Sequence, residues 1–135
     1  MTKNILILTQ PTDLHAYVVA GALARKGAQA ILWHTSDYPT RARESVLYEN
    51  GARSVRLHSP ETTLATDDDI DTVWHRRPAL RVIDTAAIDP ADREFVDAGC
   101  TTFRRGLFDG LGLIGDHSKS GPSLIDWWRS VSRRK

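Results

Sequence analysis

Two adjacent arginines, Arg76 and Arg77, follow the apolar segment 70–74 and precede Pro78. The planar guanidinium fork suits the recognition of carboxylates and phosphates. The segment before them is typical of a short strand, and ligands collect at the carboxyl edge of open α/β sheets. Successive strand residues point to opposite faces, so we expect one arginine to pair with a carboxylate of the protein and the other to face an acidic ligand. The alternative is a charged strand end that is held in water.

A polar loop at residues 34–40 follows a second apolar strand at residues 30–33. We expect Asp37 of this loop, or a neighbouring carboxylate, to be the partner of one arginine, because the loop is expected to leave the same edge of the sheet. These two segments together supply the candidate ligand-binding or peptide-binding residues, which are His34, Asp37, Tyr38, His75, Arg76 and Arg77.

The sequence predicts no catalytic, cofactor-binding or metal-binding residues. The five histidines show no i, i+4 pair and no cysteine partner, and no serine lies in a G-x-S-x-G elbow. The run Asp67–Asp69 favours a solvated loop over a cation site, because three adjacent carboxylates do not readily converge on one ion. Gly110–Gly115 matches G-x-G-x-x-G but follows a helix instead of a strand, so we interpret it as a helix-ending glycine cluster.

The elements that must position these residues begin with a strand at 5–8, a helix at 14–26 and a strand at 30–33. The helix has a capping residue at Thr12 or Asp13, its apolar residues Leu14, Val18, Ala22 and Leu23 recur at helical spacing, and Gly27 follows its end. This order is a βαβ unit with a right-handed crossover. A hairpin follows at 45–58 around Asn50-Gly51, so the fold class is α/β with a mixed sheet.

The second half is expected to hold a solvated loop at 60–69, the strand at 70–74 and a long helix that starts at Asp89-Pro90. The apolar stripe of this helix is expected to pack in the core, with Cys100 as a small hydrophobe, and it comprises Phe95, Val96, Phe103, Leu107, Phe108 and Leu111. We divide the chain into an α/β domain at 1–114 and a linker with a short basic, aromatic helix at 115–135.

Composition fixes the broad class of the protein. The 135 residues suit one domain, and a formal net charge of +1 argues against a nucleic-acid partner. No apolar run is long enough to span a membrane, and a single cysteine without a secretory signal favours the cytoplasm. For the tail, packing of Trp127 and Trp128 on this domain or on a second copy is favoured over a membrane-surface or partner-docking role. Four tryptophans in 135 residues also predict a homodimer.

Three segments, in order, resemble one group of enzymes. Trp33–Pro39 resembles a loop of the N-T-D-x-[FY]-P type, with His34 in place of Asn or Asp. Asp71–Pro78 resembles a V-W-[YW]-R-R-P segment, with His75 in place of an aromatic residue, and Phe103–Leu107 resembles the end of an E-x-x-x-x-L-R-G-L helix. The group is the ATP-grasp maturases of ribosomally made, post-translationally modified peptides (RiPPs), the microviridin or graspetide ligases. The resemblance fades after Gly112.

The resemblance implies a Rossmann-like, single-domain pre-ATP-grasp fold and the role of the N-terminal domain of a peptide-modifying ligase. The ATP clamp and the Mg²⁺ carboxylates of the group lie downstream of the matched segments. We therefore expect no cofactor in this chain and no ATP hydrolysis by it alone, with ATP and Mg²⁺ bound only in a full-length ligase. One alternative is a stand-alone module that binds a precursor peptide or a full-length ATP-grasp enzyme. A second alternative is a small α/β enzyme that uses His34, Asp37, His75 and Arg76.

Overall fold

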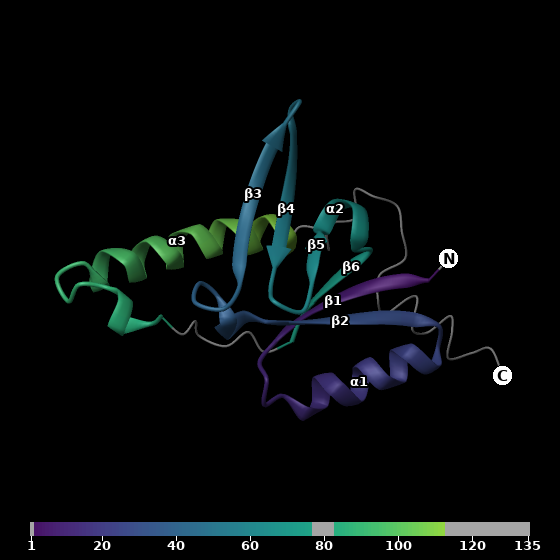
Figure 1. The fold of residues 1–135 in the computed structure, drawn as a ribbon. Coiled ribbons are helices and arrows are strands. Elements are labelled where there is room, and N and C mark those ends of the chain that lie inside the picture. The colour runs from purple at the N-terminus through teal and green to yellow at the C-terminus, as the bar shows by residue number, and fades with distance from the viewer. Residues whose placement is uncertain (1, 77–82, 113–135) are drawn as a thin grey trace.

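The fold is that of a computed structural model, which describes residues 2–76 and 83–112 of the chain (Figure 1). The predictions for Arg77 and for the tail at 115–135, including Trp127 and Trp128, concern residues outside the described part of the chain. In chain order the elements are β1 (Lys3–Thr9), α1 (Leu14–Arg25), β2 (Ala28–His34), η1 (Thr35–Asp37), β3 (Arg43–Glu49), β4 (Ala52–His58), β5 (Thr63–Ala65), α2 (Thr66–Asp69), β6 (Thr72–His75), η2 (Thr85–Ala87) and α3 (Arg93–Gly112).

The first sheet is parallel and has the order β2-β1-β6. The expected βαβ unit is confirmed: β1 pairs with β2 in parallel, and α1 connects them. The Asp13 side chain caps α1 by accepting from the Ala16 N–H, and Gly27 takes the left-handed conformation after the helix, at φ 77°. These local signals fix the helix ends, so the strand that follows is held in register with β1.

The second sheet is antiparallel and has the order β3-β4-β5. The predicted hairpin is confirmed, and Asn50 and Gly51 form its two-residue turn with φ values of 51° and 76°. Figure 1 shows the hairpin rising away from the rest of the chain. The parallel start and the antiparallel hairpin were expected in one mixed sheet, whereas in the described residues they form two three-stranded sheets.

Alternation along β1 builds a core on each face of the parallel sheet. Ile5 and Ile7 pack with Ala16 and Leu23 of α1, which lies under this face in Figure 1. Leu6 and Leu8 point the other way and pack against the antiparallel sheet and α3. The buried residues of this second cluster are Leu6, Leu8, Trp33, Ala42, Val55, Leu57, Leu64, Ile70 and Leu107. The two sheets are therefore joined through one apolar layer.

Two predictions for the helices were wrong in part. Leu14 and Val18 of α1 are 77% and 67% exposed, because the buried face of this helix is the one that carries Ala16 and Leu23. The long helix begins at Arg93 and not at Pro90, since Asp89 caps a preceding turn by accepting from the Ala91 N–H. Within its predicted core stripe Leu107 is buried, but Phe95 is 80% exposed.

The segment at 60–69 was predicted as a solvated loop, and this prediction was also wrong. It contains β5 and the short helix α2, because Leu64 and Thr66 are buried against β4. The Thr66 hydroxyl donates to the Val55 carbonyl, at 3.2 Å, and the Asp69 carboxylate accepts from the Ala65 N–H, at 2.7 Å.

Within the described part of the chain, no helix has the length and apolarity needed to cross a bilayer.

A buried ion pair joins the hairpin to α3. Arg104 of α3 donates to Glu44 Oε1 of β3, at 2.7 Å, and the Trp33 indole of β2 donates to the same oxygen, at 3.0 Å. The Glu44 side chain is fully buried, and the Arg104 side chain is 9% exposed. Burial raises the pKa of Glu44, while the Arg104 guanidinium opposes this rise. One carboxylate oxygen thus connects three elements.

We expect Glu44→Ala to lower the free energy of unfolding by about 3–5 kcal/mol, because the substitution leaves the Arg104 cation buried without its carboxylate. Glu44→Ala combined with Arg104→Ala should cost less than the sum of the two single changes, since the second change removes the stranded charge. Denaturant unfolding of the four proteins measures both effects. Ser45→Ala, at an exposed position on the same strand, is the control and should change stability by less than about 0.5 kcal/mol. Additive losses would contradict the coupling.

Candidate functional site

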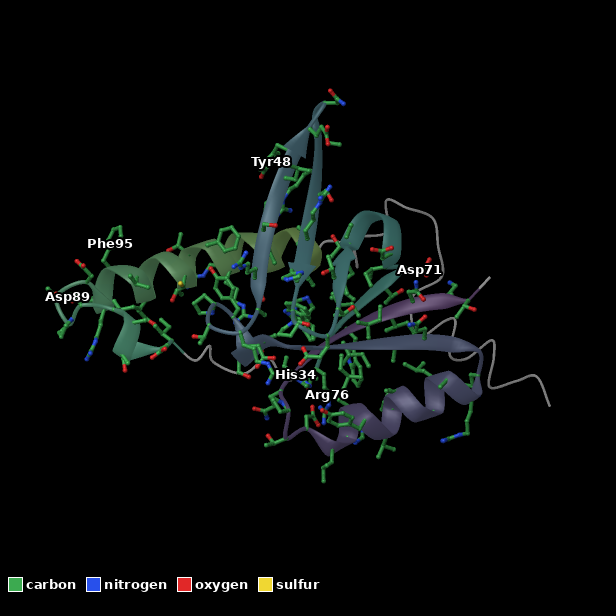
Figure 2. All side chains as sticks on the ribbon, in the orientation of Figure 1. His34, Tyr48, Asp71, Arg76, Asp89 and Phe95 are labelled. Atoms are coloured by element: carbon green, nitrogen blue, oxygen red, sulfur yellow. The ribbon has the colours of Figure 1, made fainter. Side chains whose placement is uncertain are left out.

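The carboxyl ends of the three parallel strands meet at one edge of the sheet, called here the carboxyl edge. The register pairs Thr9 of β1 with His34 of β2, and Leu8 with His75 of β6. Arg76 continues from β6, and its N–H donates to the Leu8 carbonyl, at 3.0 Å. Figure 2 shows His34 and Arg76 on this edge, beside the start of α1. The prediction that these side chains share an edge is therefore confirmed.

Arg76 is anchored on a buried carboxylate. Its Nε lies 3.5 Å from Asp13 Oδ2, and the two side chains are 22% and 3% exposed. Asp13 also accepts from the Thr9 hydroxyl, at 2.9 Å, so its position is fixed from β1. The Arg76 guanidinium lies 5.9 Å from the centre of the Trp74 ring. The arginine was expected to pair with Asp37 or a neighbouring carboxylate, and the carboxylate that it contacts is Asp13.

His34 stands between a phenol and a carboxylate. Its Nε2 lies 3.2 Å from the Tyr17 hydroxyl of α1, and its Nδ1 lies 4.0 Å from Asp37 Oδ2 of η1. The His34 and Asp37 side chains are about one-quarter exposed, at 27% and 25%. The direction of the Tyr17–His34 hydrogen bond depends on the imidazole tautomer. Either tautomer leaves the three polar groups open to solvent at the carboxyl edge.

A cleft of about 380 Å³ opens beside His34 and Asp37. Its far wall is the turn between β4 and β5, where the Thr62 N–H donates to the Ser59 hydroxyl, at 3.1 Å. Arg41 and Glu61 line the cleft and form an exposed ion pair with each other. The hydrogen bond from Arg41 lowers the pKa of Glu61. The cleft therefore offers both signs of charge and hydroxyl groups, next to apolar side chains such as Pro11 and Leu32.

Two other candidate residues, Tyr38 and His75, do not line this cleft. Tyr38 turns toward α3, where its ring stacks on Phe103 at 6.2 Å between centres and lies 5.1 Å from the Arg104 guanidinium. Burial, together with the neighbouring Cys100 thiol, raises the pKa of Tyr38 to about 12. His75 ends β6, and burial lowers its pKa. Tyr38 is thus part of the packing around the buried ion pair.

Sequence reasoning missed four residues of this site. Asp13 was identified only as a helix cap, although a capping carboxylate at the end of β1 also lies at the carboxyl edge. Tyr17 follows it by one helical turn, and this spacing was the available signal. Arg41 and Glu61 come from separate loops, so nothing local brings them together. Among the described residues, no group of three histidine, cysteine or acidic side chains is arranged to hold a metal ion.

The sequence profile described as the MvdD pre-ATP grasp domain matches residues 4–116. No match was found among curated proteins. The chain is similar in structure to a RiPP-associated ATP-grasp ligase of Chryseobacterium gregarium, solved in complex with ADP and a leader and core peptide. The TM-score is 0.71 and the identity 24%, over 97% of this chain and 40% of the ligase.

Two proteins of Microcystis aeruginosa MRC have similar folds. The macrocyclase MdnB has a TM-score of 0.69 at 24% identity, over 81% of this chain and 35% of MdnB. The macrocyclase MdnC, solved with the precursor peptide MdnA, has a TM-score of 0.66 at 24% identity, over 80% of this chain and 35% of MdnC. The chain thus spans 35–40% of the length of these three proteins.

We expect Arg76→Ala and Asp13→Ala to show coupled effects on stability, because Asp13 Oδ2 is the carboxylate oxygen that contacts the guanidinium. The coupling in a double-mutant cycle should fall at about 0.5–3 kcal/mol. The matched cycle between Arg76→Ala and Asp37→Ala should be additive within about 0.5 kcal/mol. Coupling to Asp37 in place of Asp13 would contradict the observed pairing.

We expect His75 to make the fold less stable in acid. Burial lowers the pKa of His75, so the folded protein binds this proton less tightly than the unfolded chain does. Stability is therefore lost as the pH falls below the ordinary histidine pKa of about 6.5 toward the lower folded value. The substitutions His75→Gln and His75→Phe both remove the titrating imidazole. Each should therefore reduce the change of stability with pH in this range, although the two new side chains differ in size. If the free energy of unfolding changes with pH in both variants as it does in the unmodified chain, His75 does not contribute to the loss of stability in acid.

Proposed function

Because the chain belongs to the MvdD pre-ATP grasp domain family, we propose that it acts as the N-terminal domain of an ATP-grasp ligase that modifies a ribosomally made peptide. In this role the carboxyl edge binds part of the precursor peptide. The observation that carries the proposal is Arg76, a partly exposed cation that a buried carboxylate holds at the edge where α/β folds bind ligands. An acidic group of the peptide is its natural partner.

The cleft beside His34 extends this binding surface. A peptide strand in it meets the Tyr17–His34–Asp37 group on one side and the Arg41–Glu61 pair on the other. The exposed ion pair is only weakly stabilising in water. Its two members are therefore available to exchange partners with a peptide that carries charges of both signs. The complexes with peptides described for the Chryseobacterium ligase and for MdnC support a peptide as the ligand class.

The described residues do not fit the phosphates of ATP at this edge. The loop between β1 and α1 has no glycine. The Asp13 carboxylate already accepts the hydrogen bond from the Ala16 N–H at the start of α1. A phosphate at this position would face a buried negative charge instead of free N–H groups. We therefore propose that ATP and Mg²⁺ bind to another part of the ligase and that this domain contributes no catalytic residue.

Two other roles remain as alternatives with different consequences. A stand-alone module would bind a precursor peptide or a full-length ligase without being covalently part of one. A small α/β enzyme would instead turn over a substrate at His34, Asp37, His75 and Arg76, and ATP hydrolysis by the purified chain would favour such an enzyme. The single cysteine, Cys100, is free, and we propose a cytoplasmic location on that basis.

We expect Arg76→Ala to weaken the binding of a fluorescently labelled acidic peptide by about 1–3 kcal/mol, the range for hydrogen bonds to charged groups. Fluorescence anisotropy measures the affinity, and the same peptide with its acidic residues changed to amides should bind the unmodified chain as weakly. Arg56→Ala removes an exposed arginine of β4 that does not line the cleft, and it should leave the affinity unchanged. Equal affinity of the Arg76→Ala and Arg56→Ala proteins would overturn the assignment of the edge.

A further inference from the structure

The strand β2 is an open margin of the parallel sheet. The sheet has the order β2-β1-β6, so β2 pairs with β1 on one side only. Ala30 and Leu32 of β2 are half-buried, whereas their register partners in the central strand, Ile5 and Ile7, are fully buried. The described elements therefore leave this margin partly open to solvent. An unpaired strand edge is a template for a further strand.

Hydrogen bonds show which residues of β1 face each neighbouring strand. The Leu8 carbonyl accepts from the Arg76 N–H at the end of β6, at 3.0 Å, so Leu8 faces β6. The Thr9 carbonyl accepts from the hydroxyl of Thr35, which follows β2, so Thr9 faces β2. Both backbone groups of one residue point the same way in a strand, and this direction alternates along it. Ile7 therefore also faces β2.

The outward groups of β2 follow from this alternation. In a parallel ladder, Ile7 bonds to the two residues that flank its register partner, Leu32. These two residues, Ile31 and Trp33, therefore face β1, while Ala30 and Leu32 direct their N–H and C=O groups to the open side. No hydrogen bond between described residues occupies these outward groups. Two residues thus offer two donors and two acceptors along one edge.

The open edge leads into the cleft of the carboxyl edge. Leu32 and His34 of β2 line this cleft, so the outward groups of Leu32 lie at its margin. The side chains of an added strand point alternately to the two faces of the sheet. One face is covered by α1, and the other packs against the antiparallel sheet, whose turn at 59–62 carries the Arg41–Glu61 pair into the cleft.

We propose that the precursor peptide binds as an added strand on β2, in an extended conformation that enters the cleft. This inference rests on the proposed function and specifies how the peptide is held. The cleft volume of about 380 Å³ suits a few residues of one extended chain. Because Ala30 and Leu32 bond to the peptide backbone, affinity depends on an extended segment more than on one particular sequence.

Selectivity in this arrangement comes from every second side chain of the peptide. The side chains on one face of the added strand meet the Arg41–Glu61 pair, so charged residues are favoured at alternate positions. A proline cannot donate a hydrogen bond to β2, so it is excluded where the peptide N–H points to this strand. The substrate class is therefore an extended peptide with charges at alternate positions and no proline at the pairing positions.

Amide hydrogen exchange of the ¹⁵N-labelled chain tests the pairing directly. The amides of Ala30 and Leu32 should exchange fast in the free chain, whereas those of Ile31 and Trp33 bond to β1 and are the protected internal controls. A saturating peptide of alternating valine and glutamate should slow exchange at Ala30 and Leu32 by about tenfold or more. Slow exchange at these two amides before peptide is added overturns the proposal, because the edge is then already paired.

The same titration separates this inference from the proposed function. Fluorescence anisotropy establishes whether the valine–glutamate peptide binds. If it binds and the amides of Ala30 and Leu32 still exchange fast in the saturated complex, the strand addition is wrong and the proposed function stands. If it does not bind, both are contradicted.

Methylation of single backbone nitrogens in the peptide tests the strand geometry. Only alternate N–H groups of an added strand point to β2, so methylation should weaken binding by about tenfold at every second position and by less than about twofold between them. An equal effect at all positions contradicts strand addition.

A matched pair of variants tests the edge from the side of the protein. Leu32→Pro removes one outward N–H and no bond to β1, and it should bind the peptide about tenfold more weakly than Leu32→Ala, which keeps this N–H. Circular dichroism verifies that both variants are folded, and the exchange experiment on the unmodified chain needs neither of them. Equal affinity of two folded variants contradicts the pairing.

Discussion

The arrangement of the domain depends on one buried carboxylate. Glu44 of β3 accepts from Trp33 of the parallel sheet and from Arg104 of α3, so a single side chain joins two sheets and a helix. Electrostatic attraction is strong in such a dry position, but the cost of removing both charges from water is also large. The pair therefore does more to select one packing arrangement than to add net stability, because any arrangement that separates Glu44 from Arg104 strands a charge.

The position of the candidate site follows from this constraint. The chain between β2 and β3 is held at Trp33 and at Glu44, and its Tyr38 packs on Phe103 and beside Arg104. Asp37 and Arg41 lie in this held segment and line the cleft. On the opposite side of the parallel sheet, Asp13 fixes both the start of α1 and the Arg76 side chain. Two buried carboxylates thus place the polar groups of the carboxyl edge.

The sequence predicts well what neighbouring residues determine. The apolar run at 5–8, the cap at Asp13, Gly27 and the Asn50-Gly51 turn each act within a few residues, and the structure confirms all four. The exposed face of α1 and the exposed Phe95 were not predictable in this way, because helical spacing shows that a face is apolar and not what covers it. The separation of the two sheets depends on contacts between distant strands.

The buried ion pair is the clearest example of a contact between distant segments that local sequence patterns do not show. Glu44 and Arg104 are 60 positions apart, and each has the sequence context of an ordinary surface charge. The pairing of Arg76 with Asp13 has the same origin, since a capping residue gives no sign that it also holds an arginine from β6. The arginine pair at the end of a predicted strand identified the Arg76 segment, whereas only the fold shows which carboxylate it contacts.

The most direct test of the central claim, that the carboxyl edge binds the peptide, is an amide chemical-shift titration of the ¹⁵N-labelled chain with an acidic peptide. The account predicts that the signals that move most belong to residues 9–13, 34–37 and 76, in three segments that are far apart in the sequence. The hairpin signals of β3 should not move when the peptide is added. Shifts confined to the hairpin or to the outer face of α1, with the carboxyl edge unchanged, would contradict the account.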